Sequence, residues 1–317
     1  MTTTFDIIGL GAMNLDQLYM VERLLVDGEA RVEKAVRSAG GSAANTCYGL
    51  AKLGLKVGFA GAVGDDETGQ MLVRSLAEAG VDTSHIRVKA GTTTGTALCL
   101  SDRRQRRSIY VSPGANSLLS PADLDWSYLE KASLVHTSSF ADDAQLALQI
   151  DMAQRLPAAT GISFAPGAIY ARKGLAALAP LLRRTRVLFL NHKELEMLTG
   201  DDLAGGTRAL LGSGCRLVVV TLGSQRQQDL PRDAVCYIDD GEQGLVVTAP
   251  RKKMAVVDTT GAGDAFASGF LYGIATGKGL YQCGLLGHLM AGFCITQVGA
   301  RAGLPTLEML QQSYQEY

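Results

Sequence analysis

The stretch "VVDTTGAGDAFASGFL", residues 256 to 271, contains two aspartates on either side of a turn of small residues. Gly261 and Gly263 fall where an apolar run ends and a helical pattern of large apolar residues begins. Glycine in a tight turn costs backbone entropy unless its missing Cβ is needed. A glycine-rich turn at a helix N-terminus directs free N–H groups outward, where they can bind an anion. We therefore expect a negatively charged group at this turn.

The two aspartates of this stretch add chemistry to the turn. The N-terminus of a helix carries roughly half a positive charge, which suits the charge that develops on a transferred phosphoryl group. Asp264 would stand beside that group and take a proton from an attacking hydroxyl, as a general base does in kinases. An aspartate at a helix N-terminus also stabilises the helix without any chemistry. That explanation leaves the two glycines, Thr259-Thr260 and Asp258 without a role, so the sequence favours phosphoryl transfer.

Short apolar runs alternate with longer helical patterns along most of the chain, as in proteins built from βαβ units on a parallel sheet. The expected strands are Phe5–Leu10, Val57–Ala62, Leu134–Thr137, Gly161–Phe164, Val187–Asn191 and Leu217–Thr221. The expected helices are Ala43–Leu53, Thr68–Ala79, Ala144–Arg155, Gly174–Leu182, Lys193–Leu198 and Gly205–Leu211. We predict an α/β protein whose ligands bind at the carboxyl ends of these strands.

Two segments interrupt the alternation, because residues 15–38 and 92–112 have strand-like patterns without a crossover helix. The second segment resembles a hairpin that turns near Asp102–Arg107. We expect the two segments to pair into a small discontinuous sheet beside the main domain. The predicted division is a core of residues 1–14, 37–91 and 113–317, with a β-sheet lid of residues 15–36 and 92–112.

Composition and charge limit the classes of protein that fit. The chain has 317 residues, 47% of them hydrophobic, and a net charge of −1. That balance gives no reason to expect nucleic acid or an anionic membrane as a partner. The N-terminal residues lack the features of a signal peptide, and no apolar run approaches the roughly 18 residues of a membrane span. Six cysteines without CxxC spacing indicate reduced thiols, so we expect a cytoplasmic protein: Cys47, Cys99, Cys215, Cys236, Cys283 and Cys294.

Two glycine-containing motifs near the N-terminus allow more than one interpretation. In "IIGLGAMNLD", residues 7–16, the third glycine of a dinucleotide fingerprint is replaced by Asn14 and no helix follows, so we reject NAD binding. Asn14 and Asp16 could instead bind substrate hydroxyls, or Asp16 could simply be a turn residue. In "SAGGSAANTCYGLAKLG", residues 38–54, Gly40 and Gly41 precede a helix with Asn45 in its first turn. Close packing of that helix on the sheet explains the small residues slightly better than contact with a polyol.

Polar residues also follow two later strands. Asn191 and Glu194, spaced N-x-x-E, could cap a helix or could organise the waters of a Mg²⁺ ion. Thr221, Gly223 and Ser224 end the next strand and are plausible contacts for a nucleotide phosphate.

Other conspicuous residues carry less weight. The basic stretch Arg103 to Arg107 fits a solvated hairpin tip, with contact to an anionic substrate as a second possibility. The four histidines show no metal-ligand spacing, and Ser138 and Ser139 lack the GxSxG motif of a serine hydrolase.

With these residues assembled, the chain resembles the ribokinase family of sugar kinases, also called the pfkB family. The resemblance covers essentially the whole length and rests on "GGSAANTCYGLAKLG" and "DTTGAGDAFASGF", the two signatures of that family. "GAMNLD", "SPGAN", "NHKE" and "TLGS" occur between them in the family's order. The fold it implies is a ribokinase-like three-layer α/β/α domain with a mostly parallel central sheet and a small β lid.

The resemblance also implies a role for each motif. Asp264 would be the catalytic base, and the backbone of Gly261, Ala262 and Gly263 would hold the γ-phosphate of ATP. The acceptor hydroxyls would meet Asn14, Asp16, Gly40, Gly41 and Asn45. Asn191 and Glu194 would order Mg²⁺ through water, and Asn191, Thr221, Gly223 and Ser224 would line the ATP site. A monovalent cation, K⁺, would lie near Asp258, the Thr260 carbonyl and Gly299.

The chain departs from the family pattern at two places. After "TLGS" the usual further glycine is missing, and "ISFAPGAIYARKG" lacks the Asp-x-Asn-x-Arg pattern of some sugar kinases. The expected activity is therefore transfer of the ATP γ-phosphate to a primary hydroxyl of a sugar, with a nucleoside as the alternative acceptor. A nucleotide-sensing protein on a kinase scaffold is a third hypothesis, disfavoured because a pure binder needs no base. Pairing of two lids would make a homodimer.

Overall fold

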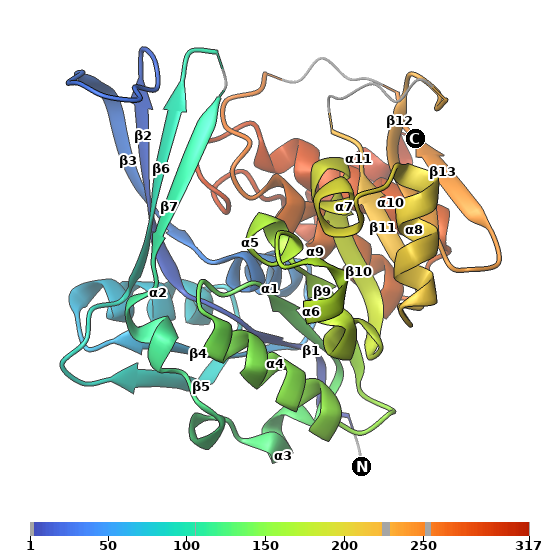
Figure 1. The fold of residues 1–317 in the computed structure, drawn as a ribbon, viewed down its shortest axis with the longest axis horizontal. Helices are drawn as coiled ribbons and strands as arrows, with labels where there is room; N and C mark the ends of the chain where they lie inside the picture. The colour runs from blue at the N-terminus through green and yellow to red at the C-terminus, as the bar shows by residue number, and fades with distance from the viewer. Residues whose placement is uncertain (1–2, 105, 224–228, 251–254, 317) are drawn as a thin grey trace.

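The computed structural model describes residues 3–104, 106–223, 229–250 and 255–316. Its main body has three layers, a large sheet with helices on both sides, and a small sheet stands away from it at one end (Figure 1). The predicted α/β class and the mostly parallel sheet are confirmed.

The described residues form a large sheet of nine strands in the order β13-β12-β11-β10-β9-β8-β1-β4-β5. Neighbours from β5 to β11 are parallel, while β12 and β13 add an antiparallel edge. The central strands are apolar runs because helices cover both of their faces. The strands are β1 (Phe5–Leu10), β4 (Val57–Gly64), β5 (Asp82–Lys89), β8 (Ala132–Ser138), β9 (Gly161–Ala165), β10 (Thr185–Asn191), β11 (Val218–Thr221), β12 (Ala234–Asp239) and β13 (Gly244–Thr248).

The small sheet has the order β3-β2-β6-β7 and joins the two segments that interrupt the alternation of strands and helices. Its strands are β2 (Asn14–Val21), β3 (Val32–Gly40), β6 (Gly95–Asp102) and β7 (Arg107–Ser112). β6 and β7 form an antiparallel hairpin, and β2 pairs with β6 in parallel although they lie far apart in the sequence. The predicted hairpin near Asp102–Arg107 is therefore confirmed.

The helices divide between the two faces of the large sheet. One face is covered by α1 (Ser42–Lys52), α2 (Glu67–Glu78), α9 (Ala262–Ala275) and α10 (Leu280–Cys294), with α11 (Leu307–Gln315) packed outside them. The other face carries α3 (Trp126–Leu129), α4 (Asp143–Arg155), α5 (Gly167–Ala171), α6 (Gly174–Leu182), α7 (His192–Thr199) and α8 (Leu203–Gly212), with the short 3₁₀ turns η1 (Gly114–Leu118) and η2 (Pro121–Asp123).

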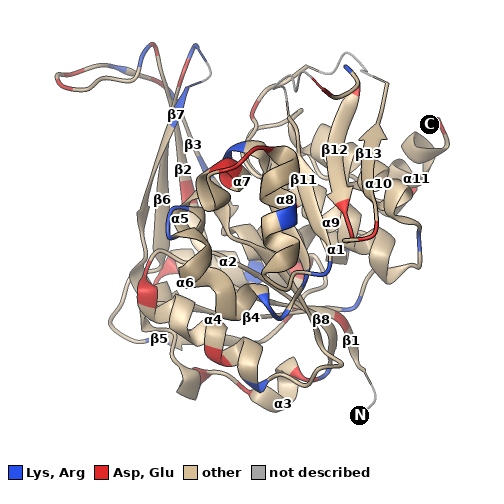
Figure 2. Cartoon of the chain, turned by 45° about the vertical axis from the view of Figure 1, so that its right-hand side comes forward, with Lys and Arg blue, Asp and Glu red and all other residues tan. Residues whose placement is uncertain are grey.

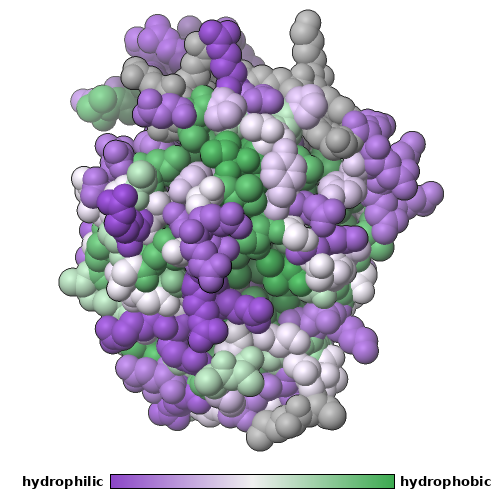
Figure 3. Space-filling model, turned by 90° about the vertical axis from the view of Figure 1, so that its right-hand side faces the viewer, coloured by the Kyte–Doolittle hydropathy of each residue, from purple (hydrophilic) through white to green (hydrophobic). Residues whose placement is uncertain are grey.

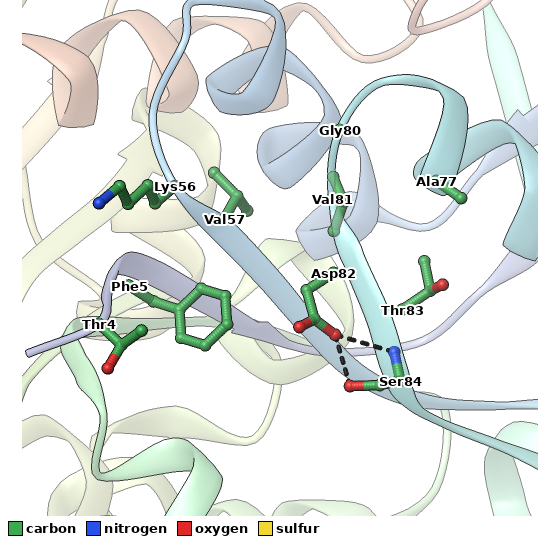
Figure 4. Close-up of a pocket in the computed structure, with 10 residues that line it drawn as sticks. All are labelled: Thr4, Phe5, Lys56, Val57, Ala77, Gly80, Val81, Asp82, Thr83 and Ser84. Atoms are coloured by element: carbon green, nitrogen blue, oxygen red, sulfur yellow. Dashed lines mark hydrogen bonds between the residues drawn. The ribbon is translucent and has the colours of Figure 1, made fainter.

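The amino ends of the strands form an open depression of about 800 Å³ (Figure 4). Residues that begin β1 and β5 line it together with Lys56, which precedes β4. In Figure 4 Asp82 turns toward Ser84, whose backbone N–H and hydroxyl both donate to it. This depression lies at the opposite end of the sheet from the residues that the sequence singles out.

The surface mixes residues of different character. Lysine and arginine are interspersed with aspartate and glutamate in Figure 2. On the face shown in Figure 3 a hydrophobic band runs down from the upper centre between hydrophilic areas. Among the described residues, no helix is both long and apolar enough to cross a membrane.

Candidate active site

The predicted site residues lie on segments that meet at the carboxyl edge of the large sheet. Gly11 to Met13 connect the end of β1 to β2, and Gly40 and Gly41 connect β3 to α1. The residue Asn191 ends β10, and Thr221 ends β11 beside it in register. The N-terminus of α9 reaches the same region because α9 packs against α1. Parallel strands place their carboxyl ends together, so this convergence follows from the topology.

Asp264 is held by the first turn of α1. Ser42 Oγ donates to one carboxylate oxygen at 2.7 Å, and Asn45 Nδ2 donates to the other at 2.9 Å. The Thr46 hydroxyl also donates to the Asp264 backbone carbonyl, at 3.3 Å. Burial raises the pKa of Asp264 above its ordinary value, and the bonds from Ser42 and Asn45 oppose that rise. The carboxylate is thus fixed in position and is a stronger base than an exposed aspartate.

Asp16 is the second buried carboxylate of the site. Its side chain faces the backbone of Gly40, where any Cβ would come within 2.2 Å of the carboxylate. Burial is the main reason that the pKa of Asp16 rises to about 7, and the nearby Asp264 carboxylate adds to the rise. Gly41 has φ 95°, and a Cβ there would meet the carbonyl oxygen of Ala12 at 2.1 Å. Both positions therefore require glycine, because the Asp16 carboxylate and the Ala12 carbonyl leave no room for a Cβ.

The turn before α9 has the conformation that the glycines predict. Gly261 is the N-cap residue with φ 77°, and a Cβ on it would lie 2.2 Å from the Cβ of Ala300. Gly263 differs, because a Cβ on it would meet no atom within 4 Å. The backbone at Gly263 therefore faces open space that a ligand could fill. The N–H of Ala262, a predicted anion donor, already donates to the Thr259 carbonyl at 3.3 Å.

Asn14 and Asn45 are both engaged by protein groups. Asn116 Nδ2 donates to Asn14 Oδ1 at 2.9 Å, and the Asn116 amide oxygen accepts from the Met13 N–H. In Asn45 the amide oxygen accepts from Arg301 Nε at 2.9 Å while the amide nitrogen donates to Asp264.

The predicted monovalent-cation residues are brought together. Asp258 accepts the Thr260 N–H and hydroxyl on one oxygen, at 3.0 and 2.8 Å. Its other oxygen accepts the Gly299 N–H at 2.9 Å. The Thr260 carbonyl accepts the thiol of Cys294 at 3.5 Å. These donors already occupy both carboxylate oxygens and the Thr260 carbonyl, and Gly299 contributes an N–H, so a cation at this place stays a prediction.

Asn191 and Glu194 form a capping box at the start of α7. The Glu194 N–H donates to the Asn191 side chain at 2.9 Å, and the Asn191 N–H donates to Glu194 Oε2 at 3.0 Å. The helix-cap interpretation of this motif is thus confirmed. Burial raises the pKa of Glu194, and the charge of Asp264 contributes to that rise.

The predicted nucleotide residues lie next to this capping box. Thr221 pairs with Asn191 across the two strands, and its hydroxyl donates to the Leu190 carbonyl at 3.4 Å. Gly223 is exposed and has φ 59°. Ser224 lies outside the described residues.

Sequence reasoning missed Arg301, Ser42 and Asn116. Ser42 is in the first signature and Asn116 is in "SPGAN", but neither pattern indicates what its side chain contacts. Arg301 is buried and follows Gly299, which has φ 87°. An arginine between two alanines near the end of the chain carries no signal of burial, so only the tertiary structure identifies it.

Comparison with known proteins agrees with this geometry. The family model described as pfkB family carbohydrate kinase matches residues 5–307. An uncharacterized sugar kinase of Archaeoglobus fulgidus is 35% identical over 81% of this chain and 98% of its own length. An ATP-dependent ribose-1-phosphate kinase of Halopiger xanaduensis is 31% identical, over 84% of this chain and 83% of its own.

Solved structures share the fold over nearly the full length. The adenosine kinase of Sinorhizobium meliloti has a TM-score of 0.81 and 25% identity, and covers 99% of both chains. The chain therefore belongs to the pfkB family of carbohydrate kinases, also called the ribokinase family, whose members include sugar and nucleoside kinases, and it is an ATP-dependent phosphotransferase.

Proposed function

We propose that the protein transfers the γ-phosphate of ATP to a primary hydroxyl of a sugar, with Asp264 as the general base. The observation that carries the proposal is the position of Asp264, whose carboxylate is fixed by Ser42 and Asn45 beside the open backbone of Gly263. A base and an anion site next to each other are what phosphoryl transfer requires.

In the proposed reaction Asp264 takes the proton of the acceptor hydroxyl as its oxygen attacks the γ-phosphorus. The bond between that phosphorus and the oxygen bridging to ADP breaks, so the products are a phosphorylated acceptor and ADP. In the turn of Gly261, Ala262 and Gly263 the N–H groups would donate to the phosphoryl oxygens, where the negative charge increases, with the Ala262 N–H exchanging the Thr259 carbonyl for the phosphate. Its helix dipole supports the same charge.

The acceptor would lie between Asp264 and Asp16. Asp16 is buried, and the charge of the nearby Asp264 contributes to the rise of the Asp16 pKa. A carboxylate accepts hydrogen bonds from two vicinal hydroxyls well, so Asp16 would orient a sugar. The glycines Gly40 and Gly41 would allow the ring to approach the backbone, with Asn14 and Asn45 beside it.

Mg²⁺ and ATP would occupy the neighbouring strand ends. Glu194 and Asn191 would hold the waters of the ion, which neutralises phosphate charge when bound. Thr221, Gly223 and Ser224 would line the nucleotide. K⁺ would bind at Asp258, the Thr260 carbonyl and Gly299, on the other side of the turn.

The small sheet is proposed to act as a lid over the acceptor, with residues 15–36 and 92–112 as the lid and the remainder as the core. The support is continuity: β2 begins at Asn14, and β3 ends at Gly40, so two strands of the sheet lead directly into the acceptor site. Closure would exclude water from the reaction.

An acceptor panel tests the proposed function. ADP release is measured with ATP, Mg²⁺ and K⁺, and with ribose, fructose, 2-keto-3-deoxygluconate, ribose 1-phosphate, adenosine, guanosine or cytidine. We expect turnover on a free or phosphorylated sugar. Turnover on nucleosides alone would establish the alternative acceptor class, for which the likeness to an adenosine kinase is the support.

Substitution of the base provides the blank for this panel. Asp264→Asn should keep the fold and lose about 10²- to 10⁴-fold in kcat, because the hydroxyl loses its base. Asp202→Asn is the matched control, since Asp202 is exposed, caps α8 and accepts the Gly205 N–H at 2.8 Å. Near-native turnover by Asp264→Asn would refute the proposed mechanism.

A further inference from the structure

Arg301 is a buried cation within the candidate site that the proposed reaction does not use. Its side chain is 7% exposed and reaches three different segments. Nε donates to Asn45 Oδ1 at 2.9 Å, Nη2 donates to the Gly40 carbonyl at 3.2 Å, and Nη1 donates to Ser75 Oγ at 3.1 Å. The guanidinium also lies over the ring of Tyr48, 5.1 Å from its centroid.

These contacts determine the orientation of the Asn45 amide. An arginine can only donate hydrogen bonds, so the atom of Asn45 that faces Nε must be the oxygen. The amide nitrogen is then directed to Asp264, which as a carboxylate can only accept. Rotation of the amide by half a turn would break both bonds. Arg301 therefore orients the Asn45 amide, which in turn holds the Asp264 carboxylate.

Arg301 also lies among negative charges. Burial lowers the pKa of Arg301 to about 10, so it remains charged at neutral pH. Its charge lowers the pKa of both Asp16 and Asp264, against the effect of their burial. Without this cation, the buried carboxyl groups of Asp16 and Asp264 would lose a nearby positive charge, and ionisation of both would become less favourable. The charged groups that act on or respond to Asp264 are Asp16, Glu194, Arg107 and Arg301, with the thiol of Cys294; Asp258 acts on Asp16 and on that thiol.

We propose that Arg301 is a positioning residue for phosphoryl transfer, which orients Asn45 so that Asp264 is held ready to accept the proton of the acceptor. The contact with the Gly40 carbonyl extends the same effect to the connection between β3 and α1. A proton acceptor displaced by about 1 Å can lose 10²-fold in rate. The kinetic part of this inference rests on the proposed function, whereas the control of Asp264 by Arg301 does not.

The first test follows the titration of Asp264 without any turnover. The protein is labelled with ¹³C at aspartate Cγ, and the Asp264 signal is identified by its loss in Asp264→Asn. We expect Arg301→Met to raise the apparent pKa of Asp264 by about one unit, since a nearby opposite charge is lost. Titration identical to that of the wild type would overturn the proposal.

The second test separates charge from geometry by kinetics. Arg301→Met should lower kcat about 10- to 100-fold and shift the acid limb of the kcat profile to higher pH. Arg301→Lys keeps the charge but lacks the planar fork, so the acid limb should return toward the wild-type position while kcat stays low. Wild-type kcat in Arg301→Lys would contradict a role in orienting Asn45. The lysine variant also serves if Arg301→Met fails to fold.

Arg184→Met is the matched control. Arg184 is partly buried and donates to three backbone carbonyls, those of Ala153, Leu156 and Pro157, at the amino end of β10. It should lose stability without any change in the Asp264 titration or the pH profile. If the wild type phosphorylates no acceptor, the proposed function fails, and the titration still decides whether Arg301 controls Asp264.

Discussion

The carboxylates at the two ends of the parallel strands have pKa values shifted in opposite directions; the carboxyl ends form the carboxyl edge of the large sheet and the amino ends its amino edge. At the carboxyl edge, burial raises the pKa of Asp16 to about 7 and raises that of Asp264. At the amino edge, Asp125 caps α3 and its pKa is lowered, first by the Ser127 hydroxyl that donates at 2.7 Å and then by His85. The side chain of Asp125 is 43% exposed.

The difference shows what each edge contributes to the molecule. Carboxylates at the amino edge gain hydrogen bonds in the folded state and so support folding. Carboxylates at the carboxyl edge are less stable as anions in the folded state than in the unfolded chain, and such costs are typical of functional sites. Substitutions at the carboxyl edge should therefore change activity and can raise stability, whereas substitutions at the amino edge should lower stability alone.

The two glycines of the turn before α9 should give the largest contrast. Gly263→Ala meets no protein atom within 4 Å and lies in a helix, so its stability should be unchanged or higher by up to about 1 kcal/mol. The new methyl would occupy the space proposed for the γ-phosphate, so kcat should fall about 100-fold.

Gly261→Ala is the partner variant for that test. Its φ of 77° and the approach to Ala300 should cost about 1–3 kcal/mol of unfolding free energy. Urea unfolding and ADP release are measured on both variants. Full activity in a well-folded Gly263→Ala would remove the anion site from the proposed mechanism.

Asp16→Asn and Asp125→Asn should change the pH dependence of stability in opposite directions. The pKa of Asp16 is raised on folding, so its stabilising contribution is complete below about pH 4 and is lost as pH rises to about 7. Asp16→Asn should therefore be more stable than the wild type at pH 8, by on the order of a few kcal/mol. Its KM for the acceptor should rise.

Asp125 has a lowered pKa, so its contribution is present at neutral pH and is lost as pH falls through the folded pKa. Because the side chain is well exposed, Asp125→Asn should cost less than about 1 kcal/mol at pH 7 and nothing in acid. Thermal unfolding from about pH 2 to 8 measures both variants, because the lowered pKa of Asp125 lies below its ordinary value of about 4. A stabilised Asp125→Asn, or a destabilised Asp16→Asn at pH 8, would contradict the contrast between the edges.

The sequence predicted the parts of the fold that repeat a regular pattern. The buried strands that it predicted are apolar runs separated by helical patterns, and the structure contains each of them: β1, β4, β8, β9, β10 and β11. It missed β5, whose sequence "DTSHIRVK" is largely polar, and the antiparallel pair β12 and β13. The strands β5 and β13 each have a single neighbour in the sheet, and β12 beside β13 is only partly buried, so fewer contacts constrain these sequences.

The candidate site was predictable where local geometry sets the role of a residue. A glycine with positive φ at a helix N-terminus, as at Gly261, follows from the motif itself. Arg301 was not predictable, because its partner Asn45 is 256 residues away and the pattern around it specifies no contact. The sequence assigned Asn45 to the acceptor, while the structure shows its amide joining Arg301 to Asp264.

Arg107 at the start of β7 faces the site, whereas most of the basic hairpin tip does not. Asp16 pairs with Ala97 on β6, and Ala97 pairs with Val111 on β7. Alternate residues of a strand share a face, so Arg107, four residues before Val111, lies on the same face as Asp16. Burial raises the pKa of Asp264, and Arg107 is among the charges that lower it.

The smallest predicted effect distinguishes Arg107 from Arg103. Arg103 forms an exposed ion pair with Glu33, so Arg103→Ala should leave both activity and melting temperature unchanged. Arg107→Ala should raise KM by roughly two- to fivefold and move the acid limb of kcat/KM slightly to higher pH, since one distant opposite charge is lost. Raising the ionic strength should raise the KM of the wild type toward that of Arg107→Ala and leave the KM of Arg107→Ala nearly unaffected, because salt screens exposed charges. Equal effects of the two alanine variants would mean that the register of β7 does not determine which arginine acts on the site, and the hairpin tip as a whole would then have to contact the ligand.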